Sequence, residues 1–189
     1  MRIPYIREII EIPSEVKVEI TDHKVIVKGP LGTLEKEFKN IPIVMYVQDN
    51  QVIIESYLAR RKDKALVGTI TSHIKNMILG TTRGWRYKLK IIYSHFPMSV
   101  KVQGDTLVIE NFLGRKSKIT VSIPKGVKVS VAKDDIIIEG IDKEIVSQFA
   151  ANIEQATTLR GKERICPHGR EGGPGVLDGI YVYVTEHMK

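Results

Sequence analysis

The stretch that decides the fold is residues 60–90, RRKDKALVGTITSHIKNMILGTTRGWRYKLK. Its apolar residues recur at helical spacing, so a helix here has one face to bury: Leu66, Ile70, Ile74, Met77 and Ile78. We predict a helix from Asp63 to about Leu79, with Asp63 near its N-terminus and Gly80 ending it. The stretch also holds nine Lys or Arg against one acid. We expect the basic residues after the helix to form a linker into a second half.

Working outward, short alternating segments precede this helix. Apolar and charged residues alternate over residues 16–20, which is the period-two pattern of a half-buried strand. Similar segments follow at 24–28, 33–38, 43–47 and 52–55, separated by turn residues. Strands followed by one helix are typical of an α+β domain, in which the helix covers one face of an antiparallel sheet.

The same order of patterns returns about eighty residues later. Four strand segments of the first half have a similar segment in the second half: 12–18 and 96–102, 24–32 and 106–114, 43–47 and 127–131, and 51–55 and 135–139. Residues 142–146 begin a second helix, as residues 63–67 begin the first. A period of this size exceeds that of solenoid repeats and suits a duplicated domain. We therefore predict two tandem α+β domains, residues 1–82 and 83–189, each a small, mostly antiparallel sheet packed on one helix. The second helix is expected to bury a stripe made of Ile145, Val146, Phe149, Ile153 and Ala156.

Composition and charge narrow the function classes. The chain has 189 residues, 42% of them hydrophobic and 27% charged, as in ordinary globular proteins, and its net charge is +7. Because the positive charge is concentrated in a few segments, an anionic partner is favoured over a generally basic surface. No apolar run is long enough to span a membrane, the N-terminus lacks a signal-peptide core, and the single cysteine, Cys166, cannot form an internal disulfide. We expect a cytoplasmic protein with no membrane partner.

Several ordered motifs resemble one protein family. They are Tyr87-Lys88-Leu89-Lys90, then Tyr93-Ser94-His95-Phe96-Pro97, Asn111-Phe112-Leu113-Gly114, Gly29-Pro30-Leu31-Gly32-Thr33-Leu34, and Leu177-Asp178-Gly179-Ile180-Tyr181-Val182. From about residue 10 to residue 184 the chain resembles the sixth large-subunit ribosomal protein family, in its archaeal and eukaryotic branch, called large-subunit protein nine in eukaryotes. The resemblance implies two α+β domains bound to large-subunit ribosomal RNA (rRNA) near the sarcin–ricin, factor-binding region. It further implies contact chiefly through the second domain and the C-terminal segment, beside neighbouring ribosomal proteins.

Lysine and arginine can neutralise phosphates, and glycines let a backbone approach RNA closely. On these grounds the candidate rRNA-binding residues fall in three groups. They are Arg83, Arg86 and Lys88 after the first helix; Arg115, Lys116 and Lys118 after a turn; and Arg160, Lys162, Arg164, His168, Arg170, Gly172, Gly173 and Gly175 near the C-terminus. For the C-terminal group the alternative is a solvated, flexible loop with ordinary charges.

Other chemistry finds little support in the sequence. Trp85 and Tyr87 could stack on bases among cations, although packing at the domain junction is the preferred interpretation of Trp85. Cys166 and His168 lack a second pair of ligands, so no metal or other cofactor is expected. The five histidines fall in no catalytic motif, and there is no phosphate-binding glycine loop after a strand, so we expect no enzyme.

The sequence thus favours an rRNA-binding structural protein of the large ribosomal subunit, monomeric when off the ribosome. Recognition is expected to use phosphates, 2′-hydroxyls and RNA shape more than base edges. The alternative is a protein–protein adaptor that uses its duplicated sheets. Salt separates the two, because phosphate-led binding weakens steeply as salt rises whereas an apolar interface changes little.

Overall fold

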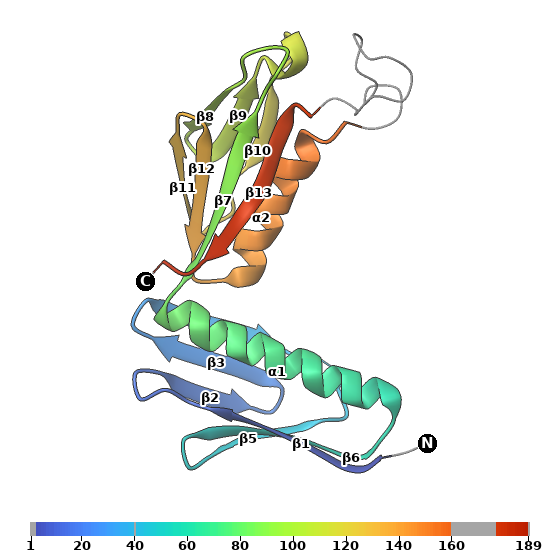
Figure 1. Ribbon diagram of the computed structural model, residues 1–189. Helices are drawn as coiled ribbons and strands as arrows, with labels where there is room; N and C mark the ends of the chain where they lie inside the picture. The colour runs from blue at the N-terminus through green and yellow to red at the C-terminus, as the bar shows by residue number, and fades with distance from the viewer. Residues whose placement is uncertain (1–2, 40, 160–176, 189) are drawn as a thin grey trace. The chain divides into compact units, whose positions relative to one another are not determined.

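The computed structural model describes residues 3–39, 41–159 and 177–188, which belong to two compact units (Figure 1). The first unit runs to Gly84 and also takes in Ile141–Lys143, and the second consists of Trp85–Gly140 and Glu144–Met188. Each unit contains helix and sheet, and every strand pairing within the described residues is antiparallel.

The first unit has two small sheets and one long helix. Its elements are β1 (Ile3–Glu11), β2 (Lys17–Thr21), β3 (Lys24–Gly29), β4 (Gly32–Glu37), β5 (Val44–Gln48), β6 (Gln51–Ala59) and α1 (Arg61–Thr82). The sheets have the orders β1-β6-β5 and β2-β3-β4, and α1 contacts strands of both. The core lies between them and includes Val25, Val52, Ile54, Ile70 and Ile74.

The second unit repeats this plan with one strand more. Its elements are β7 (Trp85–Ile92), β8 (Ser99–Gln103), β9 (Thr106–Glu110), a 3₁₀ turn η1 (Phe112–Gly114), β10 (Ile119–Ser122), β11 (Val127–Ala132), β12 (Asp135–Gly140), α2 (Lys143–Ala156) and β13 (Gly179–Glu186). The sheets are β10-β9-β8 and β11-β12-β7-β13. Leu89, Leu107, Ile136, Phe149 and Ile180 are among its core residues.

The predicted α+β class and its duplication are confirmed, with two sheets instead of one in each copy. Four strands were not predicted: β1, β7, β10 and β13. The basic linker expected after the first helix is instead β7, in which Trp85, Leu89 and Ile91 are buried while the alternate basic residues are less so. This alternation is a strand signal that the high charge of the stretch obscured.

The end of α1 differs from the prediction that Gly80 stops the helix. Gly80 is buried inside the helix, and the N–H groups of Arg83 and Gly84 donate to the carbonyl oxygen of Leu79, at 2.8 and 3.2 Å. Gly84 has a φ of 67°, the left-handed conformation that glycine adopts at helix ends. At the other end the Asp63 carboxylate accepts the N–H of Arg60 at 2.7 Å, as expected of an acidic residue in the first turn.

The second helix buries a slightly different stripe from the predicted one. Val146, Phe149, Ala150 and Ile153 are buried, whereas Ile145 is 39% exposed. The buried face of the helix is centred between Phe149, Val146 and Ile153, so Ile145 lies at the edge of that face. In the first helix Ile70, Ile74, Met77 and Ile78 are buried as predicted, and Leu66 packs partly against the core.

Two glycines of the first unit predict opposite effects of the same substitution. A Cβ on Gly29 would lie 2.7 Å from Cβ of Thr81 and 2.8 Å from its carbonyl oxygen, whereas a Cβ on Gly68 of α1 would meet nothing within 4 Å. We expect Gly29→Ala to lower the free energy of unfolding by about 1–3 kcal/mol through overpacking. Gly68→Ala should raise it by about 0.5–1 kcal/mol through helix propensity. Urea denaturation of the two variants measures both, and a destabilising Gly68→Ala would contradict this account of the helix.

Candidate nucleic-acid interface

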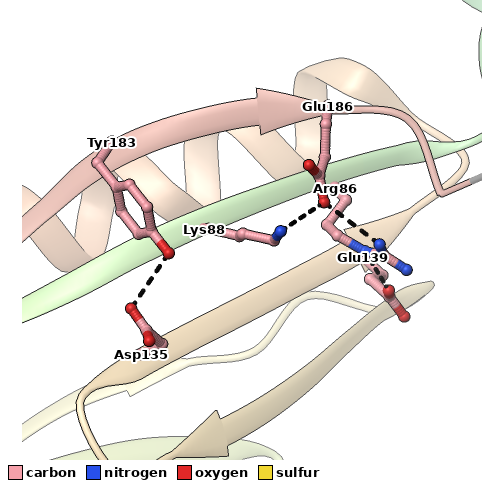
Figure 2. Close-up of polar contacts among 6 residues, drawn as sticks. All are labelled: Arg86, Lys88, Asp135, Glu139, Tyr183 and Glu186. Carbon is pink, nitrogen blue, oxygen red and sulfur yellow. Dashed lines mark hydrogen bonds and ion pairs between the residues drawn. The ribbon is translucent and has the colours of Figure 1, made fainter.

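Of the first predicted group, Arg86 and Lys88 lie on β7 and are engaged by carboxylates of the two neighbouring strands. Register places Glu139 of β12 and Glu186 of β13 on either side of Arg86. Arg86 Nε donates to Glu139 at 2.7 Å and Nη1 to Glu186 at 3.3 Å, while Lys88 Nζ donates to Glu186 at 2.8 Å (Figure 2). Lys88 and then Arg86 lower the pKa of Glu186, and Glu139 and then Glu186 raise the pKa of Arg86.

These two cations are therefore balanced by anions within the sheet. A phosphate would have to compete with carboxylates already at ion-pair distance, so Arg86 and Lys88 are poor candidates for the main RNA contact. The sequence could not reveal the pairs, because Glu139 and Glu186 are 53 and 100 residues from Arg86. Arg83 differs: it is the residue that follows α1, and it is exposed.

The second predicted group forms a tip on the second unit. Arg115, Lys116 and Lys118 are all exposed and follow η1 directly. Lys118 Nζ lies 2.7 Å from Glu110, whose pKa it lowers, and Arg115 lies over the ring of Phe112 at 6.0 Å. Lys116 makes no ion pair with any residue that the structure describes. Lys116 is therefore a cation that no carboxylate of the described residues engages, unlike Arg86 and Lys88 of β7.

The backbone that carries this tip is tightly fixed. Asn111, Leu113 and Gly114 have φ values of 59°, 52° and 73°, all in the left-handed region, which is costly for leucine. Surrounding contacts hold this conformation. Phe112 is buried in the core, the amide of Asn111 donates to the carbonyl of Pro97 at 2.9 Å, and a Cβ on Gly114 would lie 3.1 Å from the ring of Phe96.

A buried carboxylate connects the neighbouring loop to the start of β13. Asp178 is only 2% exposed and accepts the backbone N–H groups of Ser94 at 2.9 Å and His95 at 3.1 Å, with the His95 ring nitrogen Nδ1 at 3.2 Å. Burial would raise the pKa of Asp178, but the bonds from His95 and Ser94 outweigh it and hold the pKa below its ordinary value. Asp178 thus fixes Ser94 and His95, which precede Phe96 and Pro97, the residues that contact Gly114 and Asn111.

These contacts gather several loops at one end of the second unit. Figure 1 shows η1, the C-terminal end of α2 and the start of β13 at that end. The N–H of Ile180 in β13 donates to the hydroxyl of Thr157, just after α2, at 3.0 Å. The chain therefore leaves after Leu159 and returns at Leu177 beside the basic tip. The third predicted group, Arg160, Lys162, Arg164, His168, Arg170, Gly172, Gly173 and Gly175, lies outside the described residues.

Two exposed aromatic side chains at this end were not among the predicted site residues. Tyr93 is 44% exposed and Phe96 is 48% exposed, in the loop that Asp178 holds. Exposed rings beside cations can stack on bases. Phe96 lies beside Gly114, the residue before Arg115, and this contact joins distant segments, so no local sequence pattern marked it. By contrast, Trp85 is buried and its ring centroid lies 4.5 Å from that of His187, so its face is not open for stacking.

Metal and membrane sites find no support in the described part of the chain. No cluster of three or more potential metal ligands occurs among the described residues, and Cys166 and His168 lie outside them. Neither described helix combines the length and the apolar character that a membrane crossing needs.

Two tandem copies of one α+β unit, the second with an exposed cationic tip, define a duplicated α+β protein. The Ribosomal protein L6 family matches residues 12–84 and 96–165, one match in each half. A large ribosomal subunit protein uL6 from Pyrobaculum aerophilum is 60% identical over the whole length of both chains. The uL6 protein of Staphylothermus marinus is 48% identical over 97% of this chain and 96% of its own, and that of Ignicoccus hospitalis is 45% identical over 97% of each.

The chain belongs to the ribosomal protein L6 family. The resemblance found in the sequence motifs is therefore confirmed, including its archaeal branch. Members of the family are structural constituents of the ribosome and not enzymes, which confirms the expected class and the expected location on the cytoplasmic ribosome.

The Asp178 contacts generate a testable prediction. Asp178→Asn removes one acceptor and the charge, so we expect the free energy of unfolding at pH 7 to fall by about 1–3 kcal/mol. Because the folded pKa is below the unfolded value, the carboxylate stabilises the fold above roughly pH 4, and that stabilisation is lost as the pH falls through the folded value. The difference from the unsubstituted chain should therefore shrink below about pH 4.

Urea titrations of both proteins at a series of pH values measure this. Asp105→Ala, at an exposed turn position of the same unit, is the control and should change stability by less than about 0.5 kcal/mol. A difference that is constant across the pH series would show that the charge of Asp178 contributes nothing.

Proposed function

We propose that this chain binds and stabilises large-subunit rRNA near the sarcin–ricin, factor-binding region, and that the basic end of its second unit makes the contact. The carrying observation is the tip of Arg115, Lys116 and Lys118, exposed on a backbone that neighbouring contacts fix. The relatives named as large ribosomal subunit proteins support the subunit, and the region is what the resemblance to the family implies.

The mechanism is electrostatic placement on a rigid support. Cations at the tip neutralise RNA phosphates and release counterions. Because contacts with Phe96 and Pro97 fix the backbone of residues 111–114, little backbone entropy is lost there on binding. Phe96 adds exposed ring surface beside the turn that carries the cations, and the end of α2 and the start of β13 lie at the same end of the unit. Such an arrangement favours recognition of RNA shape, with bases contributing through stacking.

The first unit lacks an equivalent tip. At the corresponding place, Thr33, Glu35, Lys36 and Glu37 carry no excess of positive charge. Glu35 is also paired with Lys24, at 2.9 Å. Phosphate binding is therefore proposed for the second unit, which leaves the first free for another role.

The test is binding to a fragment of large-subunit rRNA that carries the sarcin–ricin loop and its neighbouring helices. Excess transfer RNA is the competitor, and salt is varied. We expect binding that resists the competitor and weakens steeply between about 50 and 200 mM salt. Binding no tighter than that of transfer RNA at every salt concentration would overturn the proposal.

Substitutions locate the contact. In the double variant Arg115→Ala/Lys116→Ala, we expect weaker binding to the fragment and a slope of log affinity against log salt that is smaller by about 2, since two phosphate contacts are removed. The matched control is Lys24→Ala/Lys28→Ala on β3 of the first unit, which removes the same charge from residues paired with Glu35 and Glu19. If both double variants lose the same affinity, net charge and not the tip governs binding.

A further inference from the structure

One face of the first unit is apolar although no element of that unit covers it. In the sheet β1-β6-β5, Ile10, Val52 and Ile54 face the core beneath α1, so the alternate residues face away from it. We call these alternate residues the outer sheet face: Ile3, Tyr5, Arg7, Ile9, Glu11, Val44, Tyr46, Gln48, Gln51, Ile53, Glu55, Tyr57 and Ala59. In Figure 1 α1 lies over the other side of this sheet.

The apolar residues of the outer sheet face are well exposed. Tyr5 and Ile9 are each 44% exposed, Val44 is 52% and Tyr57 is 63% exposed. Single exposed apolar residues are common, but four on one continuous sheet face, around a buried Ile53, form a patch. A patch of this kind marks an interaction site more often than a solvent-facing surface.

At the centre of this face three tyrosines share one carboxylate. Glu55, which is 6% exposed, accepts the hydroxyls of Tyr5 at 2.6 Å, Tyr46 at 3.0 Å and Tyr57 at 3.0 Å. The rings of Tyr5 and Tyr57 lie 5.3 Å apart. The first of these bonds, to Glu55, is the main reason that the pKa of Tyr5 rises to about 12, so this hydroxyl stays protonated at neutral pH. The hydroxyl hydrogens are thus committed, and the hydroxyl oxygens can only accept further bonds.

The second unit supplies an internal comparison at the same register. Arg7 lies opposite Glu55 in the first unit, as Arg86 lies opposite Glu139 in the second. Two residues beyond each arginine, Ile9 of the first unit corresponds to Lys88 of the second. Val44 lies opposite Glu55 and Lys128 lies opposite Glu139, so these two residues also correspond.

Tyr46 likewise corresponds to Ser130, since they lie opposite Ile53 and Ile137. The copy in the second unit therefore shows the polar residues that this sheet position carries when it faces solvent. The first copy has apolar or aromatic residues instead, which indicates that its outer face is covered in use.

The chemistry of the outer sheet face favours protein over RNA. Its outward positions hold one cation, Arg7, against the carboxylates of Glu11 and Glu55, although the chain as a whole carries +7. Arg7 Nε is itself 3.5 Å from Glu55. Phosphates need donors and positive charge, which this face lacks, whereas an apolar segment with lysine or arginine matches its acceptors and its charge.

We propose that the outer sheet face docks a neighbouring protein of the large ribosomal subunit through a segment with apolar side chains and a lysine or arginine directed at the tyrosine hydroxyls. This proposal rests on the proposed function in that it takes the partner to be part of the same subunit. It assigns the two copies different tasks: the second binds RNA and the first binds protein.

The test places the second copy's residues in the first. Ile9→Lys/Val44→Lys introduces the lysines found at the same register in β7 and β11. Both positions are exposed, so circular dichroism and the urea midpoint of the free protein should stay unchanged, as should affinity for the rRNA fragment. In competition with unsubstituted chain, incorporation into large ribosomal subunits should fall about tenfold, because the covered lysines would lose their hydration. The control is Thr120→Lys/Ser130→Lys, which adds equal charge at exposed strand positions of the second unit.

A cross-link identifies the occupant. With Val44→p-benzoylphenylalanine in assembled subunits, irradiation should give a protein adduct that survives nuclease. A nuclease-sensitive adduct, no adduct, or equal incorporation of Ile9→Lys/Val44→Lys overturns the docking proposal. The two proposals can fail separately. If the rRNA fragment does not bind, but the double variant is poorly incorporated into large subunits and the protein adduct forms, the docking proposal is supported and the RNA-binding proposal is contradicted. Unsubstituted chain that never enters the subunit overturns both.

Discussion

The structure of each copy depends on how closely a helix packs on its strands. In the first unit Gly29 leaves no room for a Cβ beside Thr81 of α1, and in the second a Cβ on Gly140 would lie 2.6 Å from a methyl carbon of Val146 in α2. These contacts bring the helix stripe onto the apolar side of each sheet and close the core. They also decide which side of every strand faces outward, because side chains alternate along a strand. The outer sheet face of the first unit follows from that choice.

The two copies share one arginine–glutamate pair at the same position of their sheets, but the residues around that pair differ. Arg7 and Glu55, and Arg86 and Glu139, occupy the same register, but only the second sheet continues into a further strand, β13, whose Glu186 also binds Arg86. Tyr183 of that strand donates to Asp135, which also pairs with Lys90, so the polar bonds extend across three strands (Figure 2). The first sheet has tyrosines around its glutamate instead. The same arginine–glutamate pair is therefore part of a solvated ion-pair network in one copy and of an aromatic surface in the other.

The fold could be predicted from the sequence further than the site could. The helix stripe, the strand alternation and the ordered echoes are local or periodic signals, and they indicated the class and the duplication. The sequence predicts a linker at Trp85–Ile92 because the charge of this stretch outweighs its alternation. It predicts a helix end at Gly80 because only backbone geometry distinguishes Gly80 from Gly84. The candidate site depends on partners far apart in the chain, such as Arg86 with Glu139 or Asp178 with Ser94. No window of sequence contains both members of such a pair.

This difference explains why counting lysines and arginines is a weak guide to an RNA surface. Attraction to phosphate depends on the positive charge of lysines and arginines that neighbouring carboxylates do not balance. Which carboxylates are neighbours is determined by the fold. Arg86 and Lys88 belong to the most basic stretch of the chain, yet the sheet supplies their counterions. Lys116 belongs to a short loop, yet it is exposed, and the strained backbone before it is held by Phe112, Asn111 and Phe96. A cation on a fixed support, with little charge opposing it, is the better basis for binding RNA than a larger number of cations already paired.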